Sequence, residues 1–169
     1  MNDAIKHHRS LRKLTTLVEN QTTYHSKYSE LNIFETHEVA QNISLTFNFP
    51  VIASMLTGKK IMHLEGMNAF EFVPGQSVVM PARKEMVIDF PIATKATPTQ
   101  CLALGIDADK IQEVAANFNH SISFEEEVHN FSIEEIPSHL TNNTDVNSLI
   151  ERLVNTFVMQ SKSQDVLLD

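Results

Sequence analysis

The chain of 169 residues has a single cysteine, four glycines and no tryptophan. One cysteine, Cys101, excludes an internal disulfide and any zinc site built on several thiolates. None of the glycines belongs to a GxGxxG or GxxxxGK(S/T) motif, which excludes the common phosphate-binding loops. The GxSxG elbow that carries the nucleophile of many hydrolases is also absent. The sequence therefore lacks the signatures of several large enzyme classes.

Long apolar runs and an excess of basic residues are missing as well. No run approaches the roughly 18 apolar residues of a membrane-spanning helix, and residues 4–18 lack the uninterrupted apolar stretch of a signal peptide. We therefore expect a cytoplasmic protein that does not bind a membrane. The formal net charge is −8, which disfavours direct binding to nucleic acid because phosphate contacts need clustered lysine and arginine.

The eight histidines show no metal-ligand pattern. No HxH or HxxxH pair occurs, although a catalytic metal site often takes two ligands that are close in sequence. Cys101 lies within the apolar segment 100–106, where a buried side chain is expected rather than a catalytic thiolate. We therefore expect no metal, no other cofactor and no catalytic residue.

Alternating apolar and polar residues predict a block of strands between residues 27 and 106. Ile43, Leu45 and Phe47 alternate with polar residues, which is typical of a strand with one face in water. Short apolar segments follow, and the turn residues between them leave no room for crossover helices. Many short strands joined in this way indicate an antiparallel sandwich or barrel. The segments are 51–56, 60–64, 69–73, 77–80, 86–90 and 100–106.

Helical patterns flank the strands. Asp3 is expected to cap a first helix that runs to about Asn20. A second helix is expected to open at Asp107, and its apolar face should pack on the barrel. Thr144 or Asp145 is expected to cap the last helix, which carries a wide apolar stripe. The resulting divisions are 1–26 (helix and linker), 27–118 (barrel with its exit helix), 119–143 (acidic connection) and 144–169 (start of a helical segment).

One stretch resembles the second conserved motif of cupins, G-x5-P-x-G-x2-H. Gly75 and Pro81 match this motif, whereas Arg83 stands in place of the second glycine and Met86 in place of the metal-binding histidine. The first cupin motif requires an HxH pair, and the matching stretch offers only His63. The sequence therefore predicts a cupin-like scaffold without its metal centre.

Four features along the middle of the chain carry a more specific resemblance. Residues 56–60 (LTGKK) resemble a strand that ends in a Q-G-x-K/R turn, with threonine where glutamine is usual. Residues 70–76 resemble an aromatic stretch followed by P-G-Q, and residues 80–91 resemble the next strand pair with its terminal proline. Residues 101–111 resemble a segment that leaves a barrel and enters a helix. Together these features resemble the N-terminal domain of a subgroup of AraC-type transcriptional regulators.

This resemblance implies both an architecture and a role. The implied fold is mostly β with flanking helices: a cupin-like jelly-roll barrel (a double-stranded β-helix) followed by a C-terminal helical segment. Residues 145–158 resemble the first helix of that segment. The implied role is effector binding, dimerisation, or both, in a homodimer that controls a helix-turn-helix domain. No such domain lies within these residues, so we expect DNA to be bound only by a C-terminal continuation.

Strand alternation predicts which residues would line a ligand site inside the barrel. Methionine and phenylalanine there would form a pliable apolar pocket for a small organic effector, or would simply fill the core. On 60–64 the pattern leaves open whether Ile61 and His63 or Met62 and Leu64 face inward. The candidate ligand-binding residues are His63, Phe70, Phe72, Met86, Ile88 and Phe90, and the candidate dimerisation residues are Leu149, Ile150, Leu153 and Phe157.

Other interpretations remain open at this point. A small cupin-fold enzyme, such as an isomerase or a metal-dependent oxygenase, requires three or four converging ligands, and the missing HxH argues against it. A cyclic-nucleotide module requires a phosphate cradle around an arginine, and none surrounds Arg83. A barrel that binds no ligand and only mediates an interaction also fits the sequence. The last helix likewise serves either as a dimer seam or as a cover on the barrel.

Overall fold

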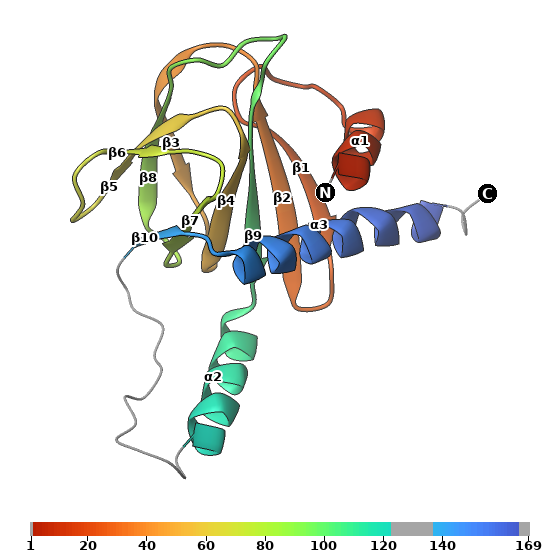
Figure 1. Cartoon of the computed structure of the whole chain (residues 1–169), viewed down its shortest axis with the longest axis vertical. Coiled ribbons are helices and arrows are strands. Elements are labelled where there is room, and N and C mark those ends of the chain that lie inside the picture. The colour runs from red at the N-terminus through yellow and green to blue at the C-terminus, as the bar shows by residue number, and fades with distance from the viewer. Residues whose placement is uncertain (1, 123–136, 166–169) are drawn as a thin grey trace.

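The computed structural model describes residues 2–122 and 137–165, which form a two-sheet β-barrel with helices on its outside (Figure 1). The elements of these residues, in chain order, are α1 (Asn2–Leu11), β1 (Asn20–His25), β2 (Ser29–Thr36), β3 (Ala40–Thr46), β4 (Val51–Thr57), β5 (Lys60–Leu64), β6 (Phe70–Phe72), β7 (Gln76–Met80), β8 (Glu85–Phe90), β9 (Thr99–Ile106), α2 (Ala108–Ile122), β10 (Ser138–Thr141) and α3 (Thr144–Asp165).

Antiparallel pairing joins these strands into two sheets. One has six strands in the order β1-β2-β9-β4-β7-β10, and the other has four in the order β3-β8-β5-β6. Between β2 and β9 the chain passes back and forth between the sheets, so that both contribute to one interior. This arrangement confirms the predicted mostly β, cupin-like fold with a helical segment at its C-terminal end.

Alternate strand positions fill the interior between the sheets. On β8, Met86, Ile88 and Phe90 are buried, as the sequence predicts, while the residues between them remain half-buried. On β5, the inward residues are Met62 and Leu64, which resolves the face that the sequence left open. The other buried members of this core are Phe34, Phe47, Val51, Ala53, Met55, Phe72, Val78, Met80, Ala93, Cys101 and Ala103.

The first helix is shorter than the sequence predicts. It ends at Leu11 instead of continuing to about Asn20, and residues 20–25 form β1. The side-chain oxygen of Asn20 accepts a hydrogen bond from the backbone N–H of Thr15 (2.9 Å), which gives that group a partner outside a helix. Glu19 then adopts a left-handed φ of 48°, and the chain turns into β1.

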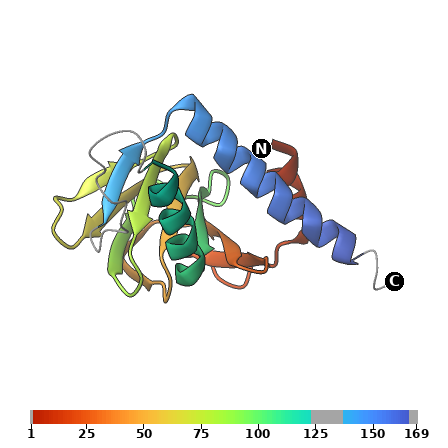
Figure 2. The ribbon, with the colours of Figure 1, turned by 90° about the horizontal axis from the view of Figure 1, so that it is seen from below.

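α1 and α3 cover the outer face of the six-stranded sheet (Figure 1, Figure 2). Because β2 and β9 bury both faces, their outward residues are apolar as well, and they form a second cluster with the helices. This outer cluster consists of Ala4, Tyr24, Leu31, Ile33, Leu102, Leu104, Val154, Phe157 and Val158.

α2 behaves differently from the prediction. The helix opens after Asp107, which caps it: its Oδ1 atom accepts hydrogen bonds from two backbone N–H groups of the first turn. The predicted packing of α2 on the barrel is wrong, since the helix continues past the end of β9 and projects away from both sheets (Figure 1). Val114, on its apolar face, is therefore 56% exposed, whereas Ile111 and Ala115 are half-buried.

α3 begins with a cap that the sequence analysis misassigned. Asn143, rather than Thr144 or Asp145, accepts a hydrogen bond from the backbone N–H of Val146 (2.9 Å). The acidic connection that precedes this helix contains β10, which pairs with β7, while its residues 123–136 lie outside the described residues. None of the described helices is long and apolar enough to cross a membrane.

A buried carboxylate attaches the N-terminal segment to the barrel. Glu35 has no solvent exposure, and its Oε2 atom lies 2.6 Å from Arg12 Nε and 3.5 Å from His8 Nε2. The amide of Gln100 donates a hydrogen bond to the other oxygen. Burial opposes ionisation of Glu35, but the hydrogen bonds from His8 and Gln100 and the charge of Arg12 outweigh it and lower its pKa.

A second buried charge pair lies inside the barrel. Lys60 Nζ is 3.0 Å from both Glu19 Oε1 and Cys101 Sγ. Burial opposes the charge on Lys60, but Cys101 and Glu19 raise its pKa above its ordinary value. Burial also raises the pKa of the Cys101 thiol. Glu19 is the carboxylate that offsets the charge of Lys60 in the interior.

We expect Glu35→Gln to lower the free energy of unfolding at pH 7 by about 3 kcal/mol, because it leaves Arg12 without its charge partner. The folded-state pKa of Glu35 lies below its ordinary value of 4.5. The contribution of ionised Glu35 to the free energy of unfolding is thus complete above its ordinary pKa. It is lost as the pH falls through the lower, folded-state pKa. Urea unfolding at pH 7 and at lower pH will measure this difference. Glu38→Gln, at an exposed position, is the control, and an equal loss for both variants would contradict the assignment.

Candidate ligand-binding site

The interior of the barrel is filled by its own side chains. Phe72, Met86, Ile88 and Phe90 are each no more than 2% exposed, and the void beside them measures about 20 Å³. That space is close to what a single water molecule requires. Phe70 is half-buried at the rim of this core, where its ring stacks on that of His139 with centroids 4.1 Å apart.

His63 does not belong to the interior, and its predicted placement there is wrong. Because Met62 and Leu64 turn inward, the side chain between them faces outward. His63 Nε2 lies 2.9 Å from Asp89 Oδ2 on the neighbouring strand. Hydrogen bonds from the Asn42 backbone N–H and from His63 lower the pKa of Asp89. This pair is a surface feature of the four-stranded sheet.

The four predicted dimerisation residues separate onto different sides of α3. Phe157 is 7% exposed and belongs to the outer cluster against the six-stranded sheet. Ile150 and Leu153 are half-buried at the edge of that cluster. Leu149 is 53% exposed and faces away from it. Phe157 therefore packs α3 against the barrel. Of the four residues, Leu149 is the one whose side chain is exposed enough to contact a partner.

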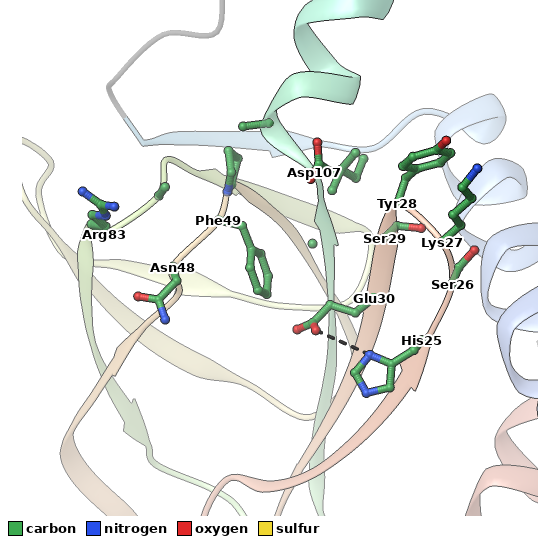
Figure 3. A pocket seen from close by; sticks show the side chains of 15 residues that line it. His25, Ser26, Lys27, Tyr28, Ser29, Glu30, Asn48, Phe49, Arg83 and Asp107 are labelled. Carbon is green, nitrogen blue, oxygen red and sulfur yellow. Dashed lines mark ion pairs between the residues drawn. The ribbon is translucent and has the colours of Figure 1, made fainter.

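A pocket of about 720 Å³ opens at one end of the barrel (Figure 3). This volume lies within the range of small-molecule sites in proteins. The pocket is built by the turn between β1 and β2, the loop between β3 and β4, the turn between β7 and β8, and the junction of β9 with α2. Its lining residues are His25, Ser26, Lys27, Tyr28, Ser29, Glu30, Asn48, Phe49, Pro50, Ala82, Arg83, Gly105, Ile106, Asp107 and Ala108.

Phe49 separates this end pocket from the barrel core. Its half-buried ring lies against Gly105, where an added Cβ atom would be 2.1 Å from Phe49 Cε2. The ring also contacts that of Phe47, which is buried in the core, with centroids 5.9 Å apart. Gly105 thus supplies the space that lets an aromatic ring form the floor of the pocket.

Arg83 stands on one rim of the end pocket (Figure 3). Its backbone adopts a left-handed φ of 63°, a conformation that glycine adopts freely and that other residues adopt at a cost. The Arg83 N–H donates a hydrogen bond to the Phe47 carbonyl (2.7 Å), which fixes the turn. Its guanidinium has no partner among the residues that the structure describes. The same position corresponds to the second glycine of the cupin motif.

The opposite rim connects the pocket to α2. Lys27 Nζ lies 4.8 Å and Lys110 Nζ lies 5.6 Å from the centre of the Tyr28 ring. The Tyr28 carbonyl accepts a hydrogen bond from the backbone N–H of Asp107 (2.9 Å), the cap of α2. Figure 3 shows Lys27 and Tyr28 across the pocket from Arg83, with Phe49 between the two sides. Any molecule in the pocket therefore lies beside the root of α2.

The two acids of the end pocket already have partners. Glu30 Oε2 is 3.8 Å from His25 Nδ1, and Glu30 Oε1 accepts a hydrogen bond from Asn32 (2.8 Å). Asp107 is occupied by the N–H groups of α2. Across residues 2–122 and 137–165, no three histidine, cysteine, aspartate or glutamate side chains are grouped to hold a metal ion.

The sequence analysis did not find the end pocket, because its residues come from four separate turns and not from one periodic pattern. The one available signal was Arg83 at a position where the cupin motif has glycine. That substitution is a departure from the motif, and the sequence alone does not indicate that it lies at a barrel mouth. The buried partners of Glu35 were equally hidden, since Arg12 and Gln100 are far from it in sequence.

Comparison with protein-family models matches residues 27–169 to the family described as the AraC-type transcriptional regulator N-terminus. The match covers most of the chain. The chain belongs to this family. The predicted family and fold are thereby confirmed. A comparison with curated proteins found no match for this AraC-type N-terminal domain.

Two solved structures of ToxT share the fold of this AraC-type domain. ToxT from Vibrio cholerae matches with a TM-score of 0.57 at 8% identity, covering 76% of this chain and 48% of ToxT. ToxT from V. cholerae O395, bound to (E)-4-(8-methylnaphthalen-1-yl)but-3-enoic acid, gives 0.56 at 9% identity, covering 78% and 49%. A cupin superfamily protein from Desulfitobacterium hafniense gives 0.43 at 14% identity, covering 58% and 85%. The chain thus spans about half the length of the ToxT chains that it matches.

We expect Gly105→Ala to lower the free energy of unfolding by about 2 kcal/mol, because its methyl group overlaps the Phe49 ring and forces a shift. In a Phe49→Ala background the same change should cost much less, since the obstructing ring is gone. Urea unfolding of the wild type, both single variants and the double variant will measure the interaction free energy between positions 49 and 105. Strictly additive effects would show that the ring does not rest on Gly105.

Proposed function

We propose that this AraC-type N-terminal domain binds a small organic effector, forms a homodimer and controls a DNA-binding domain that follows it in the full protein. The observation that carries the proposal is a ligand-sized pocket at the root of α2 in a chain of this regulator family. The role is one of binding and control, without catalysis. A regulator of this kind acts on promoter DNA in the cytoplasm, so the proposal includes a cytoplasmic location.

The end pocket is a better effector site than the barrel interior. The interior void of about 20 Å³ cannot hold an organic molecule unless core side chains move, and well-packed cores resist such movement. The end pocket is already open and combines aromatic, charged and amide side chains, the mixture that fixes a small ligand in one orientation. These observations favour an effector site at the barrel end, beside Phe49, Arg83 and Tyr28.

Effector binding at this end is coupled to α2 through two short connections. The Asp107 N–H donates to the Tyr28 carbonyl (2.9 Å), and the Ile106 N–H donates to the Pro50 carbonyl (3.3 Å). Both acceptors line the pocket, and both donors lie at the base of the helix. A ligand that binds one arrangement of these turns more tightly than another shifts the population of α2 orientations by that difference in affinity.

The homodimer is proposed to form through the outward side of α3. Val146 and Leu149 lie one turn apart and are 40% and 53% exposed, so they form an apolar stripe that the barrel does not cover. A second copy that places its own α3 against this stripe would bury these residues on both sides of a two-fold axis.

We expect the wild-type chain to be a dimer in solution and Leu149→Asp to raise the dissociation constant at least about tenfold, because it places a charge in the seam. Light scattering over a dilution series will measure the mass, and thermal unfolding will confirm that the variant is folded. Ser148→Asp, at an exposed neighbouring position, is the matched control. A monomeric wild type, or equal masses for wild type and Leu149→Asp, would refute this seam.

We expect some compounds in a chemically mixed library to stabilise the wild-type chain against thermal unfolding. A ligand at 100 times its Kd adds about 2.7 kcal/mol to the free energy of unfolding, because it binds only the folded state. Backbone amide shifts measured by NMR should then change around residues 25–30, 48–50, 82–83 and 105–108. Stabilising compounds that shift only signals elsewhere would remove the effector from the end pocket.

A further inference from the structure

The amine of Lys60 and the thiol of Cys101 meet inside the barrel. Lys60 opens β5 in the four-stranded sheet, and Cys101 lies on β9 in the six-stranded sheet. Each of the two residues is no more than 3% exposed, and the Nζ and Sγ atoms are 3.0 Å apart. A separation of about 3 to 3.5 Å between two fixed atoms is short enough for a bond to form without a rearrangement of the chain.

Glu19 fixes the Lys60 amine and also supplies a base beside it. Its Oε1 atom lies 3.0 Å from Lys60 Nζ, and its side chain is 10% exposed. The other carboxylate oxygen, Oε2, is buried and has no hydrogen-bond partner among the residues that the structure describes. Glu19 can therefore take a proton from the amine that it contacts. Such a transfer neutralises both groups at once and leaves no unpaired charge in the interior.

A small void borders the same two atoms. The interior void of about 20 Å³ is lined by Lys60 and Cys101, and the other side chains around it are apolar. That space is close to what a single water molecule requires. Hydrogen peroxide is a neutral molecule only slightly larger than water, so the void gives it a place beside the sulfur atom, whereas bulky thiol reagents do not fit.

We propose that Lys60 and Cys101 form a modification site, at which hydrogen peroxide joins the two side chains through a sulfur–nitrogen bond. In the first step the sulfur attacks one oxygen of the peroxide. An S–O bond forms, the O–O bond breaks, and the thiol proton leaves with the other oxygen as water, so that Cys101 is oxidised to a sulfenic acid by two electrons. Burial raises the pKa of the Cys101 thiol, and this step is therefore slow and needs an excess of peroxide.

In the second step the amine displaces water from the sulfenic acid. Lys60 gives one proton to Glu19, and its nitrogen then forms a bond with Cys101 Sγ. The S–O bond breaks, and the departing hydroxide takes a second proton from the nitrogen and leaves as water. The product is a sulfenamide, Cys–S–NH–Lys, the class of compound that sulfenic acids form with a neighbouring nitrogen. The two steps consume one peroxide and release two water molecules.

The bridge changes how the N-terminal segment is held. A sulfenamide nitrogen carries no charge, so Glu19 loses the cation that offsets its carboxylate. Glu19 stands at the entrance to β1, where its backbone has a left-handed φ of 48° and its N–H donates a hydrogen bond to Thr36 Oγ1 (2.9 Å). Oxidation therefore replaces an ion pair at this junction with a covalent link between the two sheets. The inference does not depend on effector binding.

The test treats the folded 169-residue chain with an excess of hydrogen peroxide and maps the products by mass spectrometry of proteolytic peptides. We expect the peptides that contain Lys60 and Cys101 to be joined, with a mass about 2 Da below their sum because two hydrogens are lost. Dithiothreitol should then restore both separate peptides, since two of its thiols reduce the S–N bond and form a disulfide.

Two variants test the role of the amine. Lys60→Met combined with Glu19→Gln removes the amine and both charges together, so that no unpaired charge stays buried. In this double variant Cys101 should stop at the sulfenic acid, which dimedone traps, or continue to the sulfinic acid, and the yield of the bridge should fall at least about tenfold. Lys59→Arg is the matched control, because Lys59 binds Glu71 (2.7 Å) at the surface, and its yield should equal that of the wild type.

The wild-type chain alone decides the outcome, even if the double variant does not fold. A joined pair of peptides from the folded chain, absent when the chain is oxidised in enough urea to unfold it, supports the inference. A Cys101 thiol that is still free once Met159, which is 41% exposed, has been fully oxidised overturns it. Conversion of Cys101 to a sulfinic acid beside an unmodified Lys60, or a bridge to any other lysine, overturns it as well.

Discussion

The ion pair between Glu35 and Arg12 holds the N-terminal segment on the barrel, and the covering of the outer sheet depends on it. A carboxylate without solvent exposure is stable only when charges and donors surround it. Its partners come from α1 (His8), from the chain just after α1 (Arg12) and from β9 (Gln100). The charge is therefore compensated only when these segments have come together. Once α1 is in place, it joins α3 over the apolar outer face of β2 and β9.

The same segment of chain also closes one end of the barrel. Arg12 binds Glu35 on the outer side of the six-stranded sheet, and a few residues later Glu19 binds Lys60 inside the barrel. The chain then enters β1 at this closed end and leaves it at His25, which lines the end pocket. Because strands run from one end of a barrel to the other, the N-terminal segment and the end pocket occupy opposite mouths. A ligand at the open mouth competes with none of the buried charge pairs.

The strands that the sequence predicts correctly either alternate apolar and polar residues, as β8 does, or form a short apolar run between turn residues, as β9 does. Met86, Ile88 and Phe90 alternate with half-buried residues, and their inward placement follows directly. β1 is different, because its sequence NQTTYH has no apolar alternation; its pairing with β2 and the burial of Tyr24 define it. α2 carries an apolar stripe typical of packing on a sheet, but it leaves the barrel at the end of β9, where no sheet face is available (Figure 1). The end pocket is formed by four turns, and turn sequences carry no periodicity that relates them in space.

A filled interior and an open mouth together determine how this domain can respond to a ligand. A core packed like that around Phe72 and Met62 is stiff and does not deform gradually. The junction of β9 with α2 is held by the Tyr28 and Pro50 carbonyls, and the exposed face of α2 gains no support from either sheet. The free energy that separates one α2 orientation from another is therefore set by a few contacts at its root. A ligand beside that root acts on those contacts directly, whereas a ligand inside the core would first have to displace side chains that hold the two sheets together.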